Sequence, residues 1–230
     1  ALALVDASGS LRGTAQLGGT IADPQGTFSM TGSGIEMAEL RSVGVGALGF
    51  EANGSLAANT IRLQEFSARG AGGLRLTASG DVPLTGTGLA VHVTGSAPLA
   101  LGNRFLVDRG GQLSGAATLD ANVSGALSEP RFGGRITTSG AGYIDPELGL
   151  RLVDIDGSAR LHGERVVIER LGARLATGGS VSLTGSIGLS APNAAALSIE
   201  LNSARYADAD LLVATLSGRL QVNGPLRRDP

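Results

Sequence analysis

The sequence predicts an all-β protein of antiparallel strands with few short helices. Three observations support this prediction: apolar and polar residues alternate, turn-forming residues interrupt the alternation at hairpin spacing, and similar segments recur about 103 residues apart. Because consecutive side chains of a strand point to opposite faces, the alternation gives each strand one apolar and one polar face. One dry face and one wet face are typical of antiparallel sheets.

The alternation is clearest in residues 152–162. One face is predicted to carry Val153, Ile155 and every second residue to Leu161, and the other to carry Leu152, Asp154 and every second residue to His162. The same rule predicts a continuous apolar face formed by Leu74, Leu76, Leu89, Val91, Val93, Leu119, Val123, Val153, Ile155, Leu161, Val181, Leu183, Ile187, Leu189, Leu197, Ile199, Leu201, Leu220 and Val222.

Turns and short helices are expected between the strands. The dipeptides Asn-Gly and Asp-Pro favour turns, which places turns at Asn53-Gly54, Asn223-Gly224, Asp23-Pro24 and Asp145-Pro146. Two segments could form short helices, the second with Asp208 or Asp210 at its N-terminus; they are Ile35–Arg41 and Ala207–Leu216.

The recurrence organises the whole chain. The segment Leu113–Ile136 has counterparts near both ends, and Gly13, Gly115 and Gly218 occupy matching places at intervals of 102 and 103 residues. Segments beginning at Gly54 and Gly157 show the same offset. We therefore expect one continuous repetitive β domain with units 1–112, 113–215 and a truncated 216–230. The chain begins and ends within this pattern, which favours a fragment of a longer protein.

Composition excludes several classes of function. With 18 basic and 20 acidic residues, the net charge of −2 argues against a nucleic-acid surface, which needs a clustered basic face. The absence of cysteine excludes disulfides and thiolate metal sites, and weakly suggests an oxidising compartment. No stretch approaches the roughly 20 apolar residues that span a bilayer.

Candidate chemical motifs are weak. Residues 44–49, GVGALG, match a dinucleotide-binding fingerprint, but that fingerprint needs a helix after it and a strand is expected there. The pairs Asp154/Asp156 and Asp208/Asp210 are interpreted as solvated carboxylates, and the two histidines, His92 and His162, as residues of the wet face. We therefore predict no enzyme activity, no catalytic residue, no metal and no cofactor.

The predicted apolar face remains as the candidate functional feature of the chain. It has two interpretations. One is the ordinary core of a β-sandwich. The other is a trough with an aliphatic lining that binds a long apolar molecule. Aromatics are only 3% of the chain and tryptophan is absent, so the large side chains that usually fill a sandwich are few. A linear repeat builds an extended structure, and frequent glycine lets a sheet bend.

Residues 110–187 resemble the repeated β-rich region of TamB-type proteins. The matching features are a Leu-Ser-Gly strand start, a turn with Val123, Gly125, Leu127 and Pro130, the run Gly149–Gly157, and the Gly-Gly strand Gly178–Gly185. The resemblance extends more loosely to residues 1–110.

This resemblance implies a fold, a location and partners. TamB-type and AsmA-like proteins of Gram-negative bacteria are anchored in the inner membrane and span the periplasm. Their elongated antiparallel sheet curls into a U-shaped trough, or β-taco, with an aliphatic interior. The family is implicated in carrying phospholipid acyl chains to the outer membrane and, through a TamA-type barrel partner, in outer-membrane protein assembly. That partner would bind regions outside this fragment. The alternative from the residues is a β-solenoid or sandwich that serves as a structural or adhesive spacer.

Overall fold

The computed structural model confirms an all-β fold of antiparallel strands with very little helix. It describes residues 7–20, 24–38, 41, 44–107, 110–189, 194–208 and 212–225. Fourteen strands form one sheet, and β1 and β14 stand at opposite ends of its strand order, so the sheet is not closed into a barrel.

The strands follow one another along the chain with short connections. The first six are β1 (Ala7–Gly19), β2 (Pro24–Met37), β3 (Leu48–Ala57), β4 (Thr60–Gly70), β5 (Arg75–Pro83) and β6 (Thr87–Pro98). The others are β7 (Gln112–Ser114), β8 (Ala116–Ala126), β9 (Glu129–Asp145), β10 (Leu150–His162), β11 (Arg165–Leu175), β12 (Ser180–Gly188), β13 (Ala194–Asp208) and β14 (Leu212–Pro225). Two 3₁₀ segments connect strands, η1 (Ala71–Gly73) and η2 (Leu99–Phe105).

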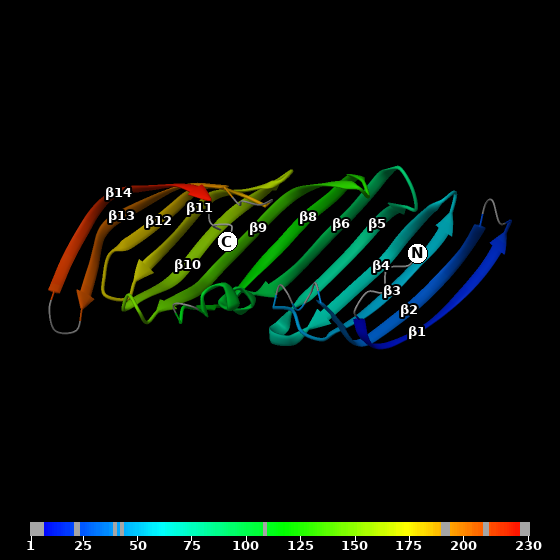
Figure 1. Ribbon diagram of the computed structural model, residues 1–230, viewed down its shortest axis with the longest axis horizontal. Helices are drawn as coiled ribbons and strands as arrows, with labels where there is room; N and C mark the ends of the chain where they lie inside the picture. Colours follow the sequence, from blue (N-terminus) through cyan, green and yellow to red (C-terminus); the bar gives the residue numbers. More distant parts are fainter. Residues whose placement is uncertain are drawn as a thin grey trace. The chain divides into compact units, whose positions relative to one another are not determined.

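Strand order follows sequence order, except that β7 lies off the main path and pairs with β9. Contacts divide the chain into two compact units. Unit 1 comprises Ala1–Leu101 and Leu119–Phe132, and unit 2 comprises Gly102–Thr118 and Gly133–Pro230. Within each unit, successive strands lie side by side (Figure 1). Apart from β7, the sheet is therefore a meander, in which each strand pairs with the strands before and after it in the order.

Tight turns set the register of the hairpins. Ala57 pairs with Thr60, so Ala58 and Asn59 form a two-residue turn, and their φ values of 47° and 57° are those of a type I′ turn. In unit 2, His162 pairs with Arg165 around a turn that begins at Gly163. Such turns match the twist of the strands that they join.

The same β-bulge occurs in both units. In unit 1 the pairing of β4 with β5 steps from Leu63–Gly80 to Phe66–Ala78, which leaves two residues of β4 opposite one of β5. In unit 2 the pairing of β11 with β12 steps in the same way, from Ile168–Gly185 to Leu171–Leu183. A bulge bends its strand and increases the local twist. Both units therefore bend at a corresponding place.

Two predicted turns are wrong. Asn53-Gly54 lies within β3 and Asn223-Gly224 within β14, where Gly54 pairs with Leu63 and Gly224 with Ala195. Neighbouring strands continue past both dipeptides, and this pairing outweighs their local preference for a turn. The turn at Asp145-Pro146 is confirmed, because the Leu148 N–H donates to Asp145 Oδ1. Asp23 lies outside the described residues, and Pro24 begins β2.

The helix predictions are largely wrong. Ile35–Met37 belong to β2, although Ala38 and Arg41 are helical. The second predicted helix is strand wherever it is described, since Ala207–Asp208 end β13 and Leu212 begins β14; Asp210 lies outside the described residues. Asp208 pairs with Leu212, so strand pairing overrides a weak helical pattern.

The structure also decides against the alternative folds. Every strand pair with a described register is antiparallel, and all of these pairs except β7–β9 join neighbours in the meander. The coils of a β-helix instead stack parallel strands. A sandwich needs two sheets, and the described strands form one.

Candidate functional site

Strand pairing assigns every side chain to a face of the sheet, because directly paired residues of antiparallel strands point to the same side. In unit 1 the pairs connect Phe28, Gly54, Leu63, Gly80 and Val91 from β2 to β6. This row is apolar throughout. The next row on the opposite face connects Thr27 with Ser55 and Arg62 with Asp81. Each face is therefore continuous from strand to strand.

The unit 1 apolar face is defined by such rows. Its large side chains are Leu11, Leu17, Phe28, Met30, Ile35, Leu48, Phe50, Leu56, Ile61, Leu63, Phe66, Leu76, Val82, Val91 and Val93. Leu74 and Leu89 continue the same alternation and are buried. Leu119 and Val123 join this face, since His92 on the other face contacts both Asp120 and Asn122.

The unit 2 apolar face is built in the same way. Its large aliphatic side chains include Ile136, Leu152, Ile155, Leu161, Val166, Ile168, Leu171, Leu175, Val181, Leu183, Ile187, Leu197, Ile199, Leu201, Leu216, Leu220 and Val222. Tyr143, paired with Leu152, and Tyr206, paired with Ala214, lie on the same face. One of its rows connects Leu171, Leu183, Ile199 and Leu220 on four successive strands.

The structure departs from the predicted faces at Val153. Val153 pairs with Arg174 and lies on the polar face, while Leu152 pairs with Leu175 on the apolar face. The cause is a β-bulge at Asp154, whose φ of 49° is left-handed, and which adds one residue to the alternation. Leu189 follows the end of β12, where its N–H donates to the Glu164 carbonyl oxygen at 2.8 Å, and it is 47% exposed. The other predicted positions lie on the apolar faces as expected.

Sequence reasoning missed the aromatic part of the unit 1 apolar face. Phe28, Phe50 and Phe66 share this face on three adjacent strands, and the rings of Phe50 and Phe66 stack with centroids 5.9 Å apart. The expected purely aliphatic lining is therefore wrong for unit 1, and it is wrong for unit 2 as well, where Tyr143 pairs with Leu152. The signal was present, since Phe28 and Met30 alternate with Thr27, Ser29 and other polar residues.

Few large side chains on the apolar faces are fully buried. Most of the buried apolar residues are alanines that lie between larger neighbours: Ala52, Ala68, Ala121, Ala141, Ala173, Ala195 and Ala204. In a two-layer protein, large side chains would be the buried ones. Here most of the large side chains inside the sheet are half-buried, because strands flank them and no second layer of described residues covers them.

The polar face carries ion pairs between strands. In unit 2, Glu169 pairs with both Arg135 and Arg160, and Asp154 pairs with Arg174. The ion pair with Asp154 raises the pKa of Arg174. These interactions link β10 with β11 and, through Arg135, β9 with β11 on the wet side of the sheet.

The predicted carboxylate pair is not brought together as an acid–base site. Asp154 reaches toward β11, whereas Asp156 accepts hydrogen bonds from Ser139 Oγ at 2.6 Å and the Gly140 N–H at 3.1 Å on β9. These two hydrogen bonds stabilise the charged carboxylate and lower the pKa of Asp156. The second pair cannot be placed, since Asp210 lies outside the described residues.

The other candidate motifs of the sequence lie in strands or in the segments that lead into them. The Gly44–Gly49 run leads directly into β3, so the helix that a dinucleotide fingerprint requires does not follow it. His92 Nδ1 lies 3.0 Å from Asn122 Oδ1, and His162 ends β10 on the exposed side. Within the described part of the chain, no three His, Asp or Glu side chains are grouped to hold a metal ion.

Comparison with known proteins adds no assignment. No family model, no curated protein and no solved structure matches this chain. Among the described residues, no helix has the length and apolar character needed to cross a membrane.

Proposed function

We propose that the apolar faces of the sheet bind the acyl chains of phospholipids, and that the protein is a non-enzymatic lipid-binding and lipid-transfer conduit. One observation supports this most directly. In each unit the apolar face continues from strand to strand, and no second layer of described residues covers it. A contiguous apolar surface of this kind marks a site for another apolar molecule.

The energetics suit a long hydrocarbon chain. Burying one methylene group is worth about 0.8 kcal/mol, so complete burial of a 16-carbon chain would gain on the order of 10 kcal/mol. Contact along one side would supply roughly half of this. Neighbouring rows present similar side chains, so a chain could move from one row to the next at little cost.

The resemblance to TamB-type proteins supplies the setting of the proposal. In that setting the protein lies in the periplasm of a Gram-negative bacterium, between inner and outer membranes, and takes part in envelope biogenesis. A membrane anchor and a TamA-type barrel partner would involve parts of a longer protein.

The first test is to purify the chain and analyse extracted lipid by mass spectrometry. We expect co-purified phospholipid, together with binding of palmitate by calorimetry below its critical micelle concentration. Absence of both would contradict the proposal and favour a structural spacer, in which the apolar faces serve only packing.

Two variants then test whether the unit 2 apolar face binds palmitate. Leu183 and Ile199 are directly paired on the unit 2 apolar face, whereas the neighbouring Thr184 is exposed on the polar face. We expect Leu183→Asp to lower palmitate binding by at least about tenfold while the far-ultraviolet circular dichroism of the fold persists, since the new charge remains near water. Thr184→Asp is the matched control and should bind as the wild type does. Unfolding of Leu183→Asp would instead indicate a packed core.

A further inference from the structure

Glycines on the apolar faces lie directly opposite large side chains. The pairs are Gly26–Leu17, Gly32–Phe50, Gly54–Phe28, Gly70–Leu48, Gly95–Leu76 and Gly157–Leu171. At Gly32 and Gly70 the atoms nearest to an added Cβ all belong to side chains, the large side chain of the pair first. At the other four glycines a backbone carbonyl oxygen of a neighbouring strand lies nearest, and the large side chain of the pair comes next. A Cβ on Gly54 would come within 2.7 Å of Phe28 Cζ, and one on Gly157 within 2.6 Å of Leu171 Cδ1. Each large side chain therefore leans across onto the neighbouring strand.

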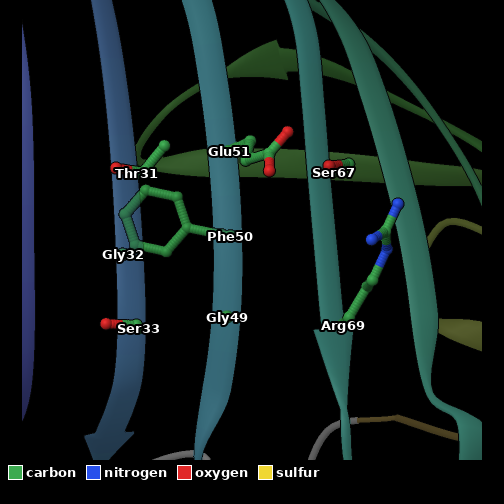
Figure 2. A pocket seen from close by; sticks show the side chains of 8 residues that line it. All are labelled: Thr31, Gly32, Ser33, Gly49, Phe50, Glu51, Ser67 and Arg69. Carbon is green, nitrogen blue, oxygen red and sulfur yellow. The ribbon is translucent and has the colours of Figure 1, made fainter.

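The pair Gly32–Phe50 shows this most clearly. Figure 2 shows the Phe50 ring reaching from β3 to β2, beside Gly32. The three atoms nearest to a Cβ on Gly32 are Phe50 Cε1, Phe50 Cδ1 at 2.7 Å and Ile35 Cγ1 at 3.0 Å, all of them in side chains. On its other side, Phe50 stacks on Phe66. The ring is thus held between a bare backbone and a second ring.

This arrangement has a physical consequence for the surface. A glycine in a strand leaves its flanking peptide groups without a side chain above them, and peptide groups are unfavourable partners for hydrocarbon. A large neighbour that leans over the glycine covers those groups with C–H atoms. The result is an apolar surface that is continuous over the glycines and has few projecting side chains.

We propose that these glycines are positioning residues for acyl-chain binding: by seating the large side chains of the opposite strand, they make the apolar face a continuous surface for a straight hydrocarbon chain. The inference rests on the proposed function. It specifies a ligand that lies across several strands and makes many equal contacts, in place of one that enters a single pocket. The glycines touch no ligand themselves and act through the side chains that they seat.

Gly32→Ala tests the inference, because the three atoms nearest to its new Cβ all belong to side chains. We expect the Phe50 ring to be displaced, seen as changed aromatic ¹³C–¹H signals of Phe50 and Phe66. Palmitate affinity should fall about fourfold, the effect of losing contact equal to one methylene group. Gly70→Ala is the second variant, since the three atoms nearest to its new Cβ belong to the side chains of Leu48 and Leu74.

Gly49→Ala is the matched control. Gly49 precedes Phe50, lies on the polar face opposite Arg69, and its Cβ would meet only the Gly32 carbonyl oxygen at 3.6 Å. This variant should bind palmitate as the wild type does. The double variant Gly32→Ala/Phe50→Val recreates the Ala78–Val93 pair of the same face and should recover most of the affinity that Gly32→Ala loses.

The outcomes separate the inference from the proposed function. If the wild type binds neither phospholipid nor palmitate, the proposed function fails. If the wild type binds palmitate and the Gly32→Ala and Gly70→Ala variants, with displaced side chains, bind it equally well, the glycines have no positioning role and the inference is overturned.

Discussion

Asp154 and Arg174 form an ion pair between β10 and β11 at the point where Asp154 adopts a left-handed backbone. The residue thus combines a surface contact with an unfavourable φ of 49°. Exposed ion pairs contribute little to stability. The bulge, which moves Leu152 onto the apolar face, is the feature with structural consequence.

The backbone at Asp154 leads to the first prediction. We expect Asp154→Gly to be more stable than Asp154→Ala by about 1 kcal/mol, because a left-handed conformation costs about that much for a residue with a Cβ. Both variants lose the ion pair equally, so the comparison isolates the backbone. Urea unfolding followed by circular dichroism measures the difference, and equal midpoints would show that the bulge carries no such strain.

Asp156 should make stability depend on acid pH. Its folded pKa lies below its ordinary value of 3.8, so the carboxylate stabilises the fold above that value, and this contribution is lost as the pH falls through the lower folded pKa. We expect wild type to be more stable than Asp156→Asn at about pH 6, and the difference to shrink toward about pH 2. Urea midpoints of both proteins across this range test the prediction. A difference that stays constant with pH would contradict it.

The alternation of residue types was sufficient to predict the fold class and most face assignments. This succeeded because the period of two is a local property, and strands such as β12 keep it over their full length, from Val181 to Ile187. It failed at Val153, because the bulge at Asp154 is visible only once β10 is paired with its neighbours. A local sequence pattern does not show where two residues of one strand lie opposite a single residue of the neighbouring strand.

The predicted site was incomplete for a similar reason. Asn53-Gly54 was interpreted as a turn, which interrupted the alternation through β3 and hid the relation of Phe50 to its neighbours. Phe28, Phe50 and Phe66 are far apart in sequence and meet only through the register of three strands. Pairing of this kind depends on neighbouring strands, and no single segment encodes it.

The turn between β3 and β4 offers a stabilising change. Ala58 has a φ of 47°, which is unfavourable for alanine, and type I′ turns prefer Asn-Gly at their two central positions. We expect Ala58→Asn to stabilise the protein by up to about 1 kcal/mol, with Asn59 retained because its Nδ2 donates to Thr85 Oγ1 at 2.8 Å. Thermal unfolding measures the change. The reverse control, Ala58→Val, should destabilise the protein, since a β-branched residue tolerates positive φ least.

The bulge at Asp154 makes a sharp prediction for ligand binding. Leu152 and Val153 are consecutive and both half-buried, but Leu152 lies on the unit 2 apolar face, paired with Leu175, and Val153 lies opposite Arg174. We expect Leu152→Asp to weaken palmitate binding about tenfold, because a charge there meets the hydrocarbon chain. Val153→Asp should leave binding unchanged, since its carboxylate would face the Arg174 guanidinium. Calorimetric titration of both variants measures this. The simple alternation of the sequence predicts the opposite order, so a stronger effect at Val153 would overturn the face assignment at this bulge.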